Sequence, residues 1–314
     1  MKRSIVSKLG MTPLALLFML LTFSSCKKDE AEESPKTITN IVTENSNYSI
    51  LESAVVKADL GSTLNGAGPF TVFAPDDAAF NSSGITGSVI QSLTADQLKD
   101  ILLYHTLGSK VMAANVPAGP NAAVTTSGGE TVYVTKNNNG VFVNGWKVKT
   151  ADIAADNGVI HSIEHVLMPP MGNIVEVAQS NDEFSYLVAA VLRASQGNTN
   201  VAAVLTSDGP FTVFAPTNQA FIDAGFPTIA SIESADPNTL ASILTYHVLD
   251  SRAFSSDLMN GQSLSTVNGE AFGVEIGSNA TVKGNSNTSA ANILAVNIMA
   301  TNGVVHVIDQ VLLP

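Results

Sequence analysis

The sequence has little cysteine, little tryptophan and few charged residues. Its 314 residues include one cysteine and one tryptophan, and charged residues make up 13% of the chain. Because Cys26 is the single thiol, an intrachain disulfide and a metal site built from several thiolates are excluded. Low charge combined with 45% hydrophobic residues is typical of a globular chain rather than a disordered one. The formal net charge of −12 argues against a nucleic acid as a general partner.

The common catalytic and nucleotide-binding motifs are also missing. The chain has no G-x-S-x-G nucleophile elbow, no P-loop and no glycine-rich dinucleotide fingerprint. We therefore expect no enzymatic activity and no cofactor. A hydrolase of an unrecognised type is an alternative. It would need a cleft of convergent polar groups with shifted pKa values, and the sequence offers no candidate for one.

The start of the chain has the pattern of an export signal. Basic residues precede an apolar run over 14–21, which is too short to cross a bilayer as a helix. Residues 1–25 are therefore predicted to be a signal peptide, and Cys26 follows two small residues. This arrangement resembles the lipobox of bacterial lipoproteins, in which the cysteine is lipidated and becomes the first residue. An ordinary secretory signal with an incidental thiol is the alternative.

Residues 26–36 are predicted to be the lipidated cysteine and a flexible tether, because they are polar and charged. The run Lys27–Glu30 resembles the charged signals that direct some lipoproteins to the outer face of the outer membrane. The resemblance implies a protein that is held on the outer membrane by lipid at Cys26 and faces outward. Two or more acyl chains give a stable anchor, since each buried methylene contributes about 0.8 kcal/mol.

Three sequence blocks occur twice in the same order, which divides the rest of the chain into two units. The blocks are Gly68–Pro75 and Gly209–Pro216, Tyr104-His105 and Tyr246-His247, and the Asn-Gly-Val stretches that begin at Asn157 and Asn302. The offset between copies is 141 residues at the first block and 145 at the last, so small loop insertions account for the difference. We predict one domain over 37–169 and a second over 171–314.

The first block predicts a strand that leads into a capped helix. Residues 70–74 are short, aromatic and β-branched, with glycine and proline at their borders. Both faces of this strand are apolar, so we expect it to be covered on both sides. Asp76 is predicted to be the N-cap of the next helix, and Thr217 has its place in the second copy. Because threonine cannot replace an acid catalyst, we interpret Asp76 as structural.

The periodicity of apolar residues predicts the other elements. Helices are expected over 38–60, 95–104, 174–179, 184–195 and 239–246. Strands are expected over 131–135, 141–143, 147–150, 159–167, 211–215 and from 263 to the end of the chain.

The three repeated blocks resemble those of the fasciclin-like domain family, present here twice. The resemblance implies an α+β fold, in which each domain is a wedge-shaped β-sandwich of two small sheets with packed helices. It also implies a cell-surface or extracellular protein concerned with adhesion and matrix organisation. In animal members the segment around the Tyr-His pair is associated with integrin binding. The candidate partner-binding residues are therefore Tyr104, His105, Tyr246 and His247.

Each Tyr-His pair also has a structural explanation. The pairs follow apolar helix faces, so the alternative is a buried tyrosine with a paired hydroxyl and a histidine that joins helix to strand through hydrogen bonds. His161 and His306 share a strand face with isoleucines and are interpreted as packed side chains. Trp146 either stacks on a sugar or belongs to the core.

The stretch from His161 to His165 spells the H-x-x-E-H pattern of some zinc peptidases. That pattern binds zinc on a helix, whereas this stretch alternates like a strand. Four strand residues separate the two histidines by roughly 13 Å. We therefore expect no metal site.

Taken together, the patterns predict a non-catalytic surface lipoprotein that mediates adhesion or binds the extracellular matrix. A bacterial host has no integrin, so the expected partner is another surface or matrix protein, or a polysaccharide. The alternative function is a glycan-binding accessory of an outer-membrane polysaccharide uptake system.

Overall fold

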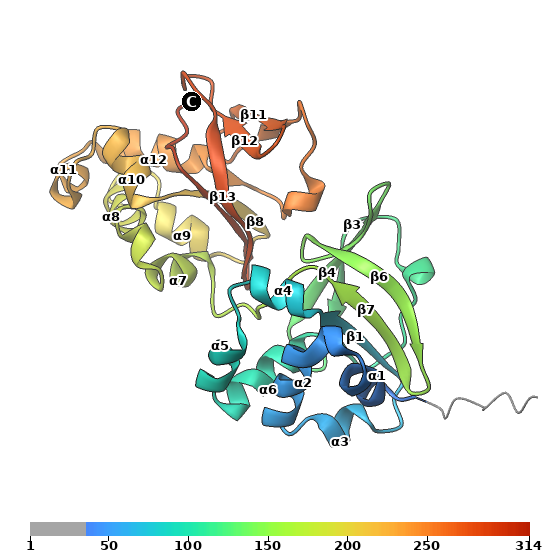
Figure 1. Ribbon diagram of the computed structural model, residues 1–314. Coiled ribbons are helices and arrows are strands. Elements are labelled where there is room, and N and C mark those ends of the chain that lie inside the picture. Colours follow the sequence, from blue (N-terminus) through green and yellow to red (C-terminus); the bar gives the residue numbers. More distant parts are fainter. Residues whose placement is uncertain (1–35) are drawn as a thin grey trace, which may run out of the picture. The chain divides into compact units, whose positions relative to one another are not determined.

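The computed structural model describes residues 36–314, which contain the same order of elements twice (Figure 1). The predicted signal peptide over 1–25, Cys26 and all of the predicted tether except Lys36 lie outside the described residues. Within the described part, no helix has the length and apolar character needed to cross a membrane.

The first domain begins with helices and ends with strands. Its elements are α1 (Ile38–Glu44), α2 (Ser49–Lys57), α3 (Gly61–Leu64), β1 (Phe70–Pro75), α4 (Asp77–Ser82), α5 (Gly87–Ser92), α6 (Ala95–Tyr104), β2 (Thr106–Leu107), β3 (Gly119–Thr125), β4 (Thr131–Asn137), β5 (Gly140–Val143), β6 (Trp146–Ala155) and β7 (Gly158–Ile163). Short 3₁₀ helices lie at Ser46–Tyr48 and Ala113–Asn115.

The second domain repeats this order. Its elements are α7 (Ile174–Gln179), α8 (Ser185–Ala194), α9 (Val201–Thr206), β8 (Phe211–Pro216), α10 (Asn218–Asp223), α11 (Ile229–Glu233), α12 (Pro237–Tyr246), β9 (Val248–Leu249), β10 (Ser263–Ser265), β11 (Ala271–Ile276), β12 (Ala280–Lys283), β13 (Ala291–Ala300) and β14 (Gly303–Ile308). Its 3₁₀ helices lie at Asp182–Phe184 and Ser255–Asp257.

Each domain has seven strands in the same arrangement. In the first domain the order is β2-β1-β7-β6-β5-β4-β3, and the second domain has the equivalent order. The first and last strands of the domain, β1 and β7, run parallel, while the other pairs are antiparallel. The long strand β6 belongs to both halves of the sheet and contains two register shifts. Such irregularities bend a strand.

The two halves of the sheet pack on a common apolar core, as the predicted α+β sandwich requires. In the first domain this core combines Phe73 of β1 and Ile163 of β7 with Val132 and Val134 of β4. A second core lies between the helices and the opposite face of β1, where Val72 is buried. The predicted fold class is thus confirmed, and β1 is covered on both sides as expected.

The first and third repeated blocks meet at one place in each domain. The Phe70 N–H donates to the Asn157 carbonyl over 2.9 Å. The Asn157 side-chain amide donates to the carbonyls of Leu64 and Gly66, and its oxygen accepts from the Ile38 N–H. In the second domain Asn302 makes the same bonds, with Phe211, Leu205, Ser207 and Ile174. The asparagine therefore ties the first helix, the loop before the strand and the strand itself together.

The blocks need glycine at these positions because the backbones of the two blocks lie too close together to leave room for a Cβ atom. A Cβ on Gly68, whose φ is +58°, would lie 2.1 Å from the Asn157 carbonyl oxygen. A Cβ on Gly158 would lie 2.1 Å from the Phe70 carbonyl oxygen. Gly209 has the equivalent position and a φ of +66°. The peptide bonds Gly68-Pro69 and Gly209-Pro210 are both cis.

Candidate functional site

The two predicted tyrosines are buried and hydrogen-bonded inside their domains. The Tyr104 hydroxyl donates to the Thr131 carbonyl over 3.1 Å and accepts from the Asn144 side-chain amide over 2.9 Å. The Tyr246 hydroxyl donates to the Ala271 carbonyl in the same way. Burial raises the pKa of Tyr104 to about 12 and also raises the pKa of Tyr246. Both phenols are therefore protonated over the physiological pH range.

The two predicted histidines join the end of a helix to the last segment of each domain. His105 Nδ1 lies 2.8 Å from the Ile101 carbonyl oxygen, and Nε2 lies 2.9 Å from the Leu167 nitrogen. Because Nε2 accepts a backbone N–H, the ring proton resides on Nδ1. His247 makes the same two contacts, with Ile243 and Leu312. Burial lowers the pKa of both rings to about 4, so each imidazole is neutral.

The repeated strand holds the segment that follows each Tyr-His pair. The Phe73 N–H donates to the His105 carbonyl over 2.9 Å. The Thr71 hydroxyl donates to the Ser109 carbonyl over 2.6 Å and accepts from the Val111 N–H. In the second domain the same contacts connect Phe214 with His247, and Thr212 with Ser251 and Ala253. In each domain, the repeated strand and the Tyr-His segment are therefore held together by these hydrogen bonds.

The side chains of the four candidate partner-binding residues, Tyr104, His105, Tyr246 and His247, are not accessible from the surface of the protein. Their exposed fractions are between 0% and 2%, so their side chains contact the interior of the domain. The turns at 108–110 and 250–251 that follow them are exposed. Partner binding by the four residues stays a prediction, and these turns are the accessible part of the segment.

The histidines of the H-x-x-E-H stretch make unrelated contacts. His161 lies on β7, where Nε2 donates to the Val111 carbonyl and Nδ1 accepts from the Asp152 N–H. His165 lies beyond the end of β7 and stacks on Trp146, with ring centroids 3.8 Å apart. Trp146 is half-buried and also packs against the core of the sandwich. Residues 36–314 contain no group of three or more histidine, cysteine or acidic side chains that could hold a metal ion.

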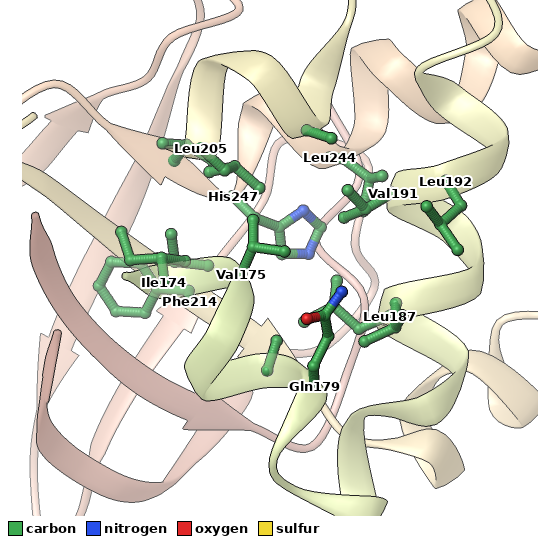
Figure 2. A pocket seen from close by; sticks show the side chains of 15 residues that line it. Ile174, Val175, Gln179, Leu187, Val191, Leu192, Leu205, Phe214, Leu244 and His247 are labelled. Carbon is green, nitrogen blue, oxygen red and sulfur yellow. The ribbon is translucent and has the colours of Figure 1, made fainter. Parts of the chain in front are cut away.

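An apolar pocket lies among the helices of each domain, and sequence reasoning missed both. The pocket of the second domain lies between α7, α8, α9, α12 and β8 and measures about 50 Å³ (Figure 2). The pocket of the first domain measures about 60 Å³. His105 lines the pocket of the first domain, and His247 lines the pocket of the second domain. The histidine of each Tyr-His pair therefore forms part of a pocket wall.

The two pockets are equivalent position by position. All 15 residues that line the second-domain pocket align with the residues that line the first-domain pocket. The positions with the same residue in both domains are Ile38 and Ile174, Leu51 and Leu187, Val55 and Val191, Leu64 and Leu205, Val72 and Val213, Phe73 and Phe214, Leu102 and Leu244, and His105 and His247. The sequence signal for the pocket is therefore the set of apolar residues that recur in the helices of both copies.

The two pockets differ in polarity. Thr39, Glu52 and Thr106 line the first-domain pocket. Their counterparts in the second domain are Val175, Val188 and Val248. The second-domain pocket is consequently the more apolar of the two.

Comparison with known proteins identifies a family and several relatives. The profile described as Fasciclin domain matches residues 46–169 and 182–314. The chain is 32% identical over 256 residues to the pig transforming growth factor-beta-induced protein ig-h3, and the match covers 80% of this chain but 35% of the pig protein. It is 38% identical over 166 residues to protein sll1483 of Synechocystis, covering 52% of this chain and 91% of that protein.

A solved structure of a domain pair is also similar to this chain. It is described as "Novel Fold Revealed by the Structure of a FAS1 Domain Pair from the Insect Cell Adhesion Molecule Fasciclin I". The match covers 88% of this chain and 96% of that chain, with 21% sequence identity and a TM-score of 0.43. Because the family profile matches both repeated units, which together make up most of the sequence, the chain belongs to the fasciclin domain family.

Proposed function

We propose that the protein is a non-catalytic, lipid-anchored protein of the outer membrane, and that its outward-facing fasciclin domains attach the cell to a surface or matrix protein. The observation that carries this proposal is the presence of two fasciclin domains in one chain. Because the two domains are linked, binding of one domain raises the effective concentration of the other domain near the same surface. Tandem domains therefore suit attachment to a repetitive surface, where each single contact is weak.

The placement of the ionisable side chains supports binding rather than catalysis. His105, His247 and His306 are buried, neutral and hydrogen-bonded to backbone groups, which leaves no ring nitrogen free to exchange a proton with a substrate. The Tyr104 hydroxyl is likewise occupied by two hydrogen bonds. These groups stabilise the domain and lie away from its surface.

The adhesion proposal is tested by deleting the domains while the anchor is kept. A strain that carries residues 1–36 without 37–314 should attach less well to surfaces, to other cells or to extracellular polymer than the parent strain. The matched control is the full chain with Cys26→Ala, which we expect to leave the membrane fraction. Unchanged attachment in the deletion strain would contradict the proposal.

The nature of the partner is tested separately. Affinity capture from the surface of intact cells, with the soluble chain 27–314 as bait, should recover a surface or matrix protein. A glycan array probed with the same bait covers the polysaccharide alternative. Array hits without a captured protein would favour the glycan-binding function instead.

A further inference from the structure

The pocket of the second domain offers apolar walls and almost no polar groups. Of its lining side chains, only His247 and Gln179 carry polar atoms. Both ring nitrogens of His247 are already engaged by backbone groups. Burying a polar group without a hydrogen-bond partner is unfavourable, so the part of a ligand that enters this pocket must be apolar.

We propose that this pocket binds the end of a straight alkyl chain, and that its ligand is a free medium-chain fatty acid. The size of the pocket favours an unbranched chain. At about 50 Å³ it has room for roughly four groups of the size of water or methylene. An engineered cavity that binds benzene is about three times larger. A linear chain therefore fits with less movement of the walls than an aromatic ring does.

The mouth of the pocket suits a carboxylate head group. Leu192 lines the pocket and is 57% exposed, which places apolar surface beside the entrance. The exposed Gln179 lies at the end of α7, and its side chain reaches the pocket beside Leu187 (Figure 2). The Gln179 side chain makes no hydrogen bond to any of residues 36–314, so its amide is available to donate to a carboxylate oxygen.

The equivalent pocket of the first domain provides a natural comparison. It has Glu52 where the second domain has Val188, and an exposed Val56 where the second domain has Leu192. The Glu52 carboxylate repels an anionic head group, because like charges a few ångströms apart interact unfavourably even near water. The fatty acid should therefore bind to the second domain, with one molecule per chain.

A chain-length series tests the alkyl pocket. The probes are straight-chain carboxylates of four to twelve carbons, titrated by calorimetry into the full mature chain carrying Cys26→Ala, which needs no detergent. Each added methylene should tighten binding about fourfold until the pocket is full, after which the affinity should level off. Benzene should not bind. Affinity that does not depend on chain length, or equal binding of benzene, would overturn the assignment.

Exchanging the residues at positions 52 and 188 between the two pockets tests which domain binds the fatty acid. Val188→Glu should weaken the binding of the best acid tenfold or more at low salt. Glu52→Val should create a second, weaker site in the first domain, which has Thr43 where the second domain has Gln179. Each variant introduces the residue that the other domain already accommodates, and an unchanged thermal unfolding curve shows that it has folded. The control Leu294→Glu, on the exposed side of β13, should have no effect.

A vesicle experiment separates a free acid from a membrane lipid. The Cys26→Ala chain is mixed with phosphatidylcholine vesicles and sedimented. We expect the protein to stay in the supernatant while it binds free acids. Sedimentation that is lost in Val188→Glu, without binding of free acids, would show that the pocket takes membrane acyl chains and would overturn the free-acid assignment. The adhesion proposal does not depend on either result.

Discussion

The repeated histidines connect neighbouring segments through hydrogen bonds, and the two types have opposite tautomers. His105 and His247 carry the proton on Nδ1 and accept a backbone N–H at Nε2. His161 and His306 donate from Nε2 to a carbonyl and accept a backbone N–H at Nδ1. Protonation of His105, His247 or His306 would turn the acceptor nitrogen of that ring into a donor that faces another donor. The fold therefore requires the neutral form of these three rings.

This requirement predicts that the protein loses stability in mild acid. Burial lowers the pKa of His105, His247 and His306 to about 4, against an ordinary value of 6.5. As pH falls below 6.5 the unfolded chain takes up protons that the folded chain excludes, so stability present above pH 6.5 decreases towards pH 4. Each ring contributes about 1.4 kcal/mol per pH unit within this window. Thermal unfolding followed by circular dichroism between pH 7.5 and 4.5 measures the loss.

A glutamine variant supplies the control for the pH experiment. His247→Gln keeps a donor and an acceptor but cannot titrate, so its melting temperature should fall less steeply with pH than that of the parent protein. A parent melting temperature that stays constant from pH 7 to 4.5 would contradict the neutral assignment of these rings.

At the scale of elements, the N-cap after the repeated strand should tolerate a carboxylate in place of the hydroxyl. Asp76 accepts from the Ala79 N–H over 2.8 Å, and Thr217 accepts from the Ala220 N–H over 3.2 Å. We expect Thr217→Ala to destabilise the protein by about 1 kcal/mol, whereas Thr217→Asp should leave it nearly unchanged. Urea unfolding of the two variants compares the caps directly. Equal loss of stability in both would show that the side-chain cap contributes nothing.

Elements with a strong local pattern could be predicted from the sequence, and the exceptions have physical causes. Helix α7 has the predicted bounds, and β1 extends the predicted strand by one residue. The predicted helix over 38–60 is interrupted near Asn45, whose side chain accepts from the Asn47 N–H and caps a new turn. The strand predicted over 147–150 continues to Ala155, because its register shifts hide the alternation of apolar residues.

The candidate site could be predicted less well, because it depends on contacts between distant residues. The alternating pattern with Val159, Ile163 and Leu167 predicts a strand over 159–167, but β7 ends at Ile163. Leu167 instead donates to a ring nitrogen of His105, 62 residues earlier in the chain. The Tyr-His repeat was visible in the sequence, whereas its burial and the pockets beside it follow from the packing of helices against β1.

At the scale of the whole molecule, the two domains have separate cores. The large apolar clusters draw their residues either from 38–167 or from 174–312. A small additional cluster around Phe254 also includes Tyr133. The single tryptophan of the chain, Trp146, lies in the first domain, so its fluorescence reports the unfolding of that domain.

We therefore expect a core mutation in one domain to leave the other folded. His247→Ala removes the acceptor of the Leu312 N–H and opens a cavity, which should destabilise the second domain by about 2–4 kcal/mol. Circular dichroism should then show an earlier transition, while the Trp146 fluorescence transition keeps its midpoint. The matched variant His105→Ala should shift the fluorescence transition instead. If both variants shift both signals together, the tandem domains unfold as one cooperative unit, and the separation of their cores does not determine how the molecule unfolds.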